Sequence, residues 1–198
     1  MTGRRTTLST TLALALAVAT AGCASSEPAA SSPESSSSAA EPDLAAFGIA
    51  GLSGAEAVDT LEAVPVAERS TDLMASVQST ALELTTPDGE TSLPLPEDLF
   101  YLSVAPYVEQ THPCGFHSLT TCRGELGGED IDVEVVDEAT GETILDETRT
   151  AADNGFVGLW LPRDIEATLT VALDGKTSTT SVSTDDDAET CLTTMQLT

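Results

Sequence analysis

The first regular pattern of apolar and polar positions is helical. Ser53 and Glu56 have the spacing of a capping box, in which each side chain bonds the other residue's backbone N–H at the start of a helix. Pro65 is a helix-stopping residue. Between them, apolar side chains recur every three or four positions, at Ala57, Val58, Leu61 and Val64. The pattern predicts one short amphipathic helix.

Strand patterns follow this helix. Leu82 and Leu84 alternate with polar residues, and the sequence at residues 87–90 is typical of a turn. Residues 100–104 form another short apolar run, which favours a strand. One helix and a few strands make a small α+β unit. We therefore predict an N-terminal α+β domain over residues 43–110.

A period of two dominates the rest of the chain. Ile131, Val133 and Val135 alternate with acidic residues before a turn at residues 138–141, which predicts a β-hairpin. We expect an antiparallel, sandwich-like β-rich domain over residues 111–198, and hence an α+β chain. Its further strands are predicted at residues 156–161, 165–173, 176–183 and 190–197.

The N-terminus has the pattern of a bacterial export signal. Residues 1–22 contain no acid, and Arg4 and Arg5 precede an apolar run that is too short to span a bilayer. Small residues before Cys23 predict cleavage there and a lipid on the new N-terminal cysteine. We therefore expect a protein anchored to the cell membrane and facing outside the cytoplasm. A freely secreted protein is the alternative, because Thr20 stands where such signals usually have leucine.

The sequence also indicates a linker after the export signal and a strongly negative net charge. Residues 23–42 have no large apolar side chain and are rich in serine, alanine and proline, which predicts a disordered tether. The formal net charge is −26, with 33 acidic and 7 basic residues. This charge excludes nucleic acid as a partner and leaves the lipid as the membrane contact. The acidic residues 185–187 are typical of a solvated loop rather than of a cation site.

Soft metal ligands are concentrated in residues 112–122. The segment holds two cysteines and both histidines of the chain, and Cys191 lies near the C-terminus. Thiolate, imidazole and thioether groups suit Cu(I) and Zn(II), and they do not suit Mg(II) or Ca(II). We predict a metal site formed by Cys114, Cys122, Cys191 and His117, with His112 and Met195 as further candidate ligands.

Copper is the preferred ion because Cu(I) accepts two or three soft ligands. Structural zinc usually takes four ligands from spaced Cys/His pairs, and the chain has no paired C-x2-C motifs, so zinc is the alternative. Two thiolates can also reduce two Cu(II) ions and leave one disulfide. That reaction is stoichiometric unless a partner re-reduces the cysteines, so we do not predict an enzyme.

A structural disulfide is the competing interpretation of these cysteines. Export places them in an oxidising compartment, where Cys114 and Cys122 most simply close a short loop. The protein would then be a disulfide-stapled interaction module without metal. Three cysteines cannot all pair within one chain, so one thiol remains free or pairs between chains.

Four blocks of the sequence resemble the CueP family of exported bacterial copper-binding proteins. They are FYLSVAPY at residues 100–107, THPCGFHSLTTCRGEL at 111–126, NGFVGLWLP at 154–162 and TCLTTMQL at 190–197. The resemblance implies copper handling outside the cytoplasm, with Cys114, Cys122 and Cys191 as functional thiols beside His117. It also implies two domains and a homodimer. A secreted cuproprotein acceptor and a thiol reductant are the partners expected for such a protein.

Overall fold

The computed structural model describes residues 42–198. The predicted export signal, Cys23 and residues 23–41 of the predicted linker lie outside the described residues. Within residues 42–198 the chain forms one α-helix, two 3-10 helices and eleven strands in three sheets. No helix in this part of the chain is both long enough and apolar enough to cross a membrane.

The predicted helix is confirmed, together with its capping box. Helix α1 (Gly54–Glu62) begins where the Ser53 hydroxyl accepts the backbone N–H of Glu56 and the Glu56 carboxylate accepts that of Ser53. These bonds satisfy N–H groups that the first helical turn leaves without partners. Short 3-10 helices precede and follow α1, as η1 (Leu44–Phe47) and η2 (Val66–Glu68).

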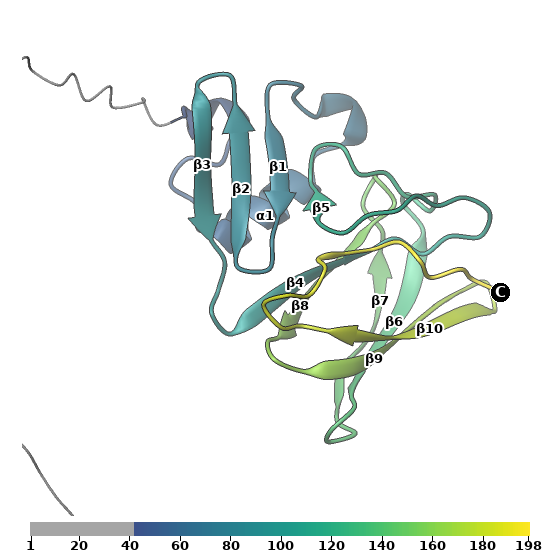
Figure 1. The fold of residues 1–198 in the computed structure, drawn as a ribbon. Helices are drawn as coiled ribbons and strands as arrows, with labels where there is room; N and C mark the ends of the chain where they lie inside the picture. Colours follow the sequence, from purple (N-terminus) through teal and green to yellow (C-terminus); the bar gives the residue numbers. More distant parts are fainter. Residues whose placement is uncertain (1–41) are drawn as a thin grey trace, which may run out of the picture. The chain divides into compact units, whose positions relative to one another are not determined.

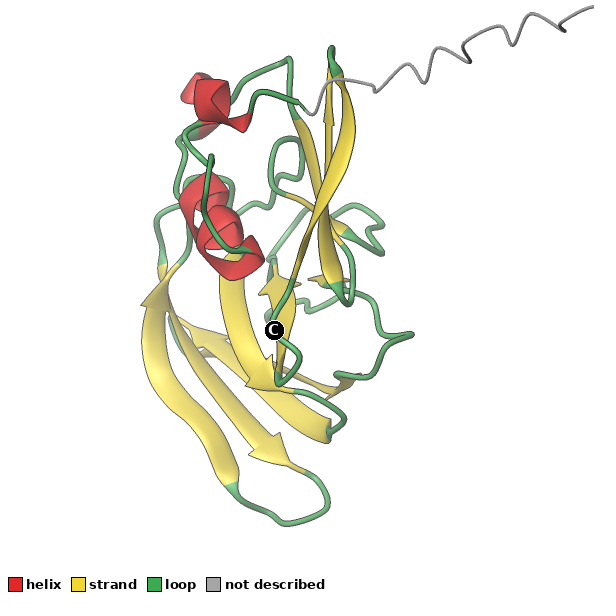
Figure 2. Ribbon diagram, turned by 90° about the vertical axis from the view of Figure 1, so that its left-hand side faces the viewer, coloured by secondary structure: helices red, strands yellow, loops and turns green. Residues whose placement is uncertain are grey.

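Helix α1 packs on a four-stranded antiparallel sheet. Val58 and Leu61 of the helix share a core with Leu82 and Leu84 of the sheet. Figure 1 shows β1, β2 and β3 side by side, and Figure 2 shows the helices on one side of these strands. The strands, in spatial order, are β3 (Gly89–Pro94), β2 (Ala81–Thr86), β1 (Met74–Val77) and β5 (His117–Ser118).

Two further sheets enclose a second core. The predicted hairpin is confirmed as β6 (Asp130–Asp137) and β7 (Thr143–Thr150), and it belongs to a sheet with the order β10-β9-β6-β7. The third sheet has the order β11-β4-β8. The remaining strands of these sheets are β4 (Leu99–Val104), β8 (Val157–Pro162), β9 (Glu166–Leu173), β10 (Lys176–Ser183) and β11 (Cys191–Leu192).

Strand β4 connects the two cores because both of its faces are buried. Phe100 and Leu102 point into the core between the second and third sheets, whereas Tyr101 points into the core under α1. Strands from either side of residue 110 therefore share sheets: β4 pairs with β8, and β5 pairs with β1. The two-domain division at residue 110 stays a prediction.

The C-terminal segment differs from its prediction. The expected strand over residues 190–197 is reduced to β11, followed by an isolated bridge between Gln196 and Tyr107. Strand β11 runs parallel to β4, with Cys191 opposite Ser103. The described residues are thus mostly β-sheet with one α-helix, and the C-terminal part is β-rich as predicted.

Candidate metal centre

Two strand ends bring the predicted ligands together. Cys191 opens β11, and its backbone N–H donates to the Gly115 carbonyl oxygen at 3.2 Å. His117 opens β5 and pairs with Val77 of β1, while the Thr190 hydroxyl accepts the His117 backbone N–H at 3.0 Å. The C-terminal segment is therefore held against the 112–122 segment by backbone hydrogen bonds as well as by its side chains.

The sulfur atoms of Cys114, Cys122 and Cys191 lie close together. Two of them form a disulfide that the sequence did not indicate. Cys114 forms a disulfide with Cys191, with their Cα atoms 5.6 Å apart. Cys122 is the free cysteine of the described residues, and its Sγ lies 3.5 Å from the Cys114 Sγ. The pairing of Cys114 with Cys122, which spacing alone favoured, is thus not the one formed. The partner is Cys191, because pairing of β11 with β4 brings the chain end to this loop.

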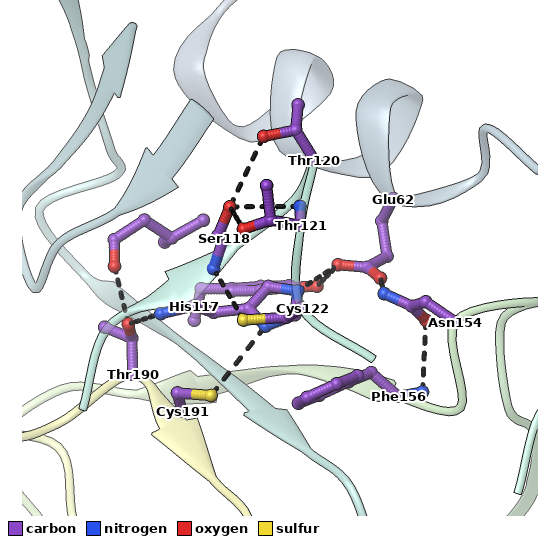
Figure 3. Close-up of polar contacts among 12 residues, drawn as sticks. Glu62, His117, Ser118, Thr120, Thr121, Cys122, Asn154, Phe156, Thr190 and Cys191 are labelled. Carbon is purple, nitrogen blue, oxygen red and sulfur yellow. Dashed lines mark hydrogen bonds and ion pairs between the residues drawn. The ribbon is translucent and has the colours of Figure 1, made fainter. Parts of the chain in front are cut away.

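His117 lies between these sulfurs and a buried carboxylate. Its side chain has no solvent exposure, its Nδ1 is 3.9 Å from the Cys191 Sγ, and its Nε2 is 2.7 Å from the Glu62 Oε2 (Figure 3). An ionised carboxylate can only accept hydrogen bonds, so Nε2 carries the proton. The other ring nitrogen, Nδ1, is thereby directed toward the sulfurs, where it can bind a metal ion once it has lost its own proton.

The candidate ligands form two overlapping groups. His112, Cys114 and Cys122 make one group, and His117, Cys122 and Cys191 make the other. Within each group the ligand atoms lie within 4.8 Å of one another. Cys122 belongs to both groups. Cysteine and histidine atoms at this separation can hold a metal ion.

The two further candidate ligands, His112 and Met195, have different surroundings. His112 is half-buried, and its ring stands edge-on to Phe156 with 6.4 Å between ring centroids. Met195 is 1% exposed and packs in the core between the second and third sheets, together with Phe100 and Leu102. Cys191 belongs to a different, small apolar cluster, which also contains Phe156. The structure therefore brings His112 to the cysteines and places Met195 in the main core.

A buried polar network surrounds the Glu62 carboxylate, which accepts the hydrogen bond from His117. The Asn154 side-chain amide donates to the Glu62 Oε1 at 2.6 Å, and the Tyr101 hydroxyl donates to the Glu62 Oε2 at 3.2 Å. The Arg69 guanidinium lies 3.7 Å from the same carboxylate, with its side chain 5% exposed. Burial by itself would raise the pKa of Glu62. The hydrogen bonds from His117 and Asn154 and the Arg69 charge outweigh it, so the pKa is lowered and the carboxylate stays ionised.

The same contacts shift the pKa values of His117 and Cys122 in opposite directions. Burial would lower the pKa of His117, but hydrogen bonds to Cys122 and Glu62 outweigh it and the pKa is raised. Burial would raise the pKa of Cys122, but the hydrogen bonds from His117 and from the Ser118 backbone N–H outweigh it and the pKa is lowered. A lowered thiol pKa increases the fraction of thiolate, the form that binds metal.

Glu62, Asn154, Arg69 and Tyr101 were missed as site residues. One signal for Glu62 was present, since it follows Val58 by four residues and so lies on the apolar face of α1. A carboxylate on a buried face needs a charged or hydrogen-bonding partner. Its partner, His117, is 55 residues away, and helical spacing alone could not identify it.

Comparisons with known proteins show which family this chain belongs to. The family described as "Periplasmic copper-binding protein CueP" matches residues 56–196. The crystal structure of S.CueP is similar, with a TM-score of 0.73 and 41% sequence identity, covering 78% of this chain and 94% of that one. Among curated protein sequences, none matches this chain.

Proposed function

This chain belongs to the CueP family, and from that premise we propose that it binds copper outside the cytoplasm through its three cysteine thiols and His117. The observation that most supports this proposal is that the three described cysteines and both histidines lie in two overlapping groups. These residues come from two segments that are about 70 positions apart in the chain. Two sheet edges bring them together, and the resulting ligand set is soft throughout.

The oxidation state of the cysteines decides when the site binds copper. In the disulfide state, Cys114 and Cys191 carry no thiolate, and Cys122 is the remaining sulfur ligand. After reduction, Cys114 and Cys191 each add a thiolate to that of Cys122, the residue that the two ligand groups share. Cu(I) is stable with two or three such ligands, so the reduced form is the copper-binding form. His112 is half-buried, belongs to the group with Cys114 and Cys122, and is the second nitrogen candidate.

The same pair of cysteines can supply electrons to copper. The thiolates of Cys114 and Cys191 give one electron each to two Cu(II) ions, which yields two Cu(I) ions and one disulfide. Each further round needs a thiol reductant to restore both thiolates. We therefore propose stoichiometric capture and reduction, supported by the disulfide between two candidate ligands, rather than an enzyme that turns over by itself.

The cellular role that we propose is copper tolerance, or delivery of Cu(I) to a secreted cuproprotein. The family description places its members in the periplasm, and export of this chain agrees with that. Attachment through a lipid on Cys23 and formation of a homodimer remain proposals. Labelling of cells with a palmitate analogue, in parent and Cys23→Ser forms, tests the lipid.

A Cu(I) competition titration tests the proposed site. The reduced protein is titrated without oxygen against a coloured Cu(I) chelator, and the C114S/C122S/C191S variant should lose high-affinity binding. Met74→Leu is the matched control, because Met74 offers a soft ligand that is 64% exposed and stands outside both groups. A triple variant that binds Cu(I) as tightly as the parent would contradict the proposal. A Zn(II) competition in the same format distinguishes copper from zinc.

The disulfide also supports a second candidate function, a stapled interaction module without metal. Such a module would keep the Cys114–Cys191 bond permanently and would not respond to copper. A thiol count on protein from the cell envelope, before and after mild reduction, separates the two functions. Two additional thiols that disappear again when Cu(II) is added favour copper handling.

A further inference from the structure

The free cysteine lies against the disulfide rather than apart from it. The Cys122 Sγ is 3.5 Å from the Cys114 Sγ, and the Ser118 backbone N–H donates to the Cys122 Sγ at 3.3 Å, which holds that sulfur in place. Cys122 and Cys114 are both half-buried, whereas Cys191 is 2% exposed. A thiol, an accessible sulfur and a buried sulfur therefore lie within one small cluster.

We propose that Cys114 is a pivot whose disulfide exchanges between Cys191 and Cys122. The Cys122 thiolate attacks the Cys114 Sγ, so the Cys114–Cys122 bond forms and the Cys114–Cys191 bond breaks. Cys191 leaves as a thiolate and takes up the proton that Cys122 has released. One disulfide and one thiol are present before and after the step, so it needs no external oxidant or reductant. The proposal concerns the same thiols as the proposed copper site, but it does not depend on copper.

The exchange requires a side-chain rotation, which the local structure allows. The attacking, central and leaving sulfurs must approach a straight line, whereas the Cys122 and Cys191 sulfurs lie within 4.8 Å of each other, which is too close for a straight line through the Cys114 sulfur. Cys114 lies outside the strands, between Pro113 and Gly115. The hydrogen bond from the Cys191 backbone N–H to the Gly115 carbonyl stays in place while the side chains turn. The C-terminal segment therefore need not detach.

The exchange moves the oxidised pair from a buried position to an accessible one. In the Cys114–Cys191 form, one sulfur of the bond belongs to a residue that is almost fully covered. In the Cys114–Cys122 form, both sulfurs belong to half-buried residues, which a thiol reductant can reach. The released Cys191 thiol is left 3.9 Å from the Nδ1 of His117, as a soft ligand pair inside the protein. Cys122 thus acts as a relay thiol for re-reduction of the site.

Peptide mapping of the metal-free parent protein tests the exchange. The oxidised protein is equilibrated with a chelator at neutral pH, acidified, unfolded with N-ethylmaleimide at mildly acidic pH, and digested with trypsin. Cleavage after Arg69, Arg123 and Lys176 places Cys114 and Cys122 in peptide 70–123 and Cys191 in peptide 177–198. We expect most of peptide 177–198 crosslinked to 70–123. A smaller fraction should be free and labelled on Cys191, together with unlabelled, internally bonded 70–123.

Two variants provide the matched comparison. The C122S variant has no thiol that can attack the disulfide, so any labelled Cys191 in it measures incomplete oxidation. The fraction of labelled Cys191 in the parent should be several-fold higher. C191S should oxidise to the Cys114–Cys122 pair and leave neither thiol in peptide 70–123 open to label. The proposal is overturned if the parent's labelled Cys191 equals the C122S value, or if folded C191S keeps both thiols. The parent mapping requires no substitution, and neither result changes if the protein fails to bind copper.

Discussion

The Glu62 carboxylate accepts a hydrogen bond from the His117 ring at 2.7 Å, although 55 residues separate the two in the chain. The bond connects the last residue of α1 to the first residue of β5. It sets which ring nitrogen faces the cysteines, and it gives a buried carboxylate a hydrogen-bonding partner. The stability of the fold and the orientation of a metal ligand therefore depend on the same contact.

Replacing Glu62 should weaken both properties. Glu62→Gln keeps the shape but removes the charge, so we expect the free energy of unfolding to fall by about 2 kcal/mol, since a hydrogen bond to a charged group is lost. Cu(I) affinity should fall by about 10- to 100-fold, as for other partners of metal-binding histidines. Urea unfolding and the Cu(I) competition measure the two effects. Glu83→Gln, at an exposed position of β2, should change neither; equal behaviour of the two variants would contradict the assignment.

The hydrogen-bonded pair of Glu62 and His117 should also make the stability of the protein depend on pH. The pKa of Glu62 is lowered by folding, so its contribution is complete above the unfolded value of about 4.3 and is lost as pH falls through the folded value. The pKa of His117 is raised, so its contribution is complete below about 6.5 and is lost as pH rises through the folded value.

Stability from the pair is therefore expected to peak between about pH 4.3 and 6.5. Urea midpoints of the oxidised protein measured across pH should show this maximum, and Glu62→Gln should flatten it. A parallel shift of the whole curve, without flattening, would mean that other groups set the pH dependence.

Cys122 should be an unusually reactive thiol. Its pKa is lowered by the His117 ring and the Ser118 N–H, so the rate of alkylation of oxidised protein should reach half its maximum below the ordinary thiol value of about 8.5. His117→Gln should move that midpoint upward. Label on peptide 70–123 reports the reaction, and C122S provides the blank. A midpoint that stays unchanged in His117→Gln would show that the imidazole does not act on this thiol.

Gly155 and Gly141 both have a positive φ, but only Gly155 also lies close to another part of the backbone. Gly155 has a φ of +80°, and a Cβ at this position would lie 2.6 Å from the backbone carbon of Gly124, just after the cysteine loop. Gly141 has a similar φ of +71° with no atom within 4 Å of such a Cβ. Both alanine variants incur the cost of a positive φ, about 1 kcal/mol, and Gly155→Ala must also displace the backbone.

Gly155→Ala should therefore lower the free energy of unfolding by at least about 1 kcal/mol more than Gly141→Ala. It should also disturb Asn154, whose side chain holds Glu62, and so reduce Cu(I) affinity. Gly141→Ala should leave copper binding unchanged. Equal losses of stability in the two variants would show that the close approach to Gly124 contributes nothing.

Local patterns in the sequence predicted the local elements well. The capping box at Ser53 and Glu56 marked the start of α1, and alternation from Ile131 to Val135 predicted β6 and its hairpin. These signals succeed because both ends of each interaction lie within a few residues. Residues 74–77 gave no clear pattern, although they form β1, the strand that β5 joins and that positions His117.

The sequence by itself determined which side chains can bind a soft metal, and it showed that one of the three cysteines outside the N-terminal segment could not pair within the chain. Only the tertiary structure decided that Cys191 pairs with Cys114, that Cys122 lies against their bond, and that Glu62 supports His117. Residue types and spacings are local information. Those three relationships depend on parallel pairing of β11 with β4 and on packing of α1 with Leu119, the residue after β5, in one core. These contacts join residues 50 to 90 positions apart, which no local pattern records.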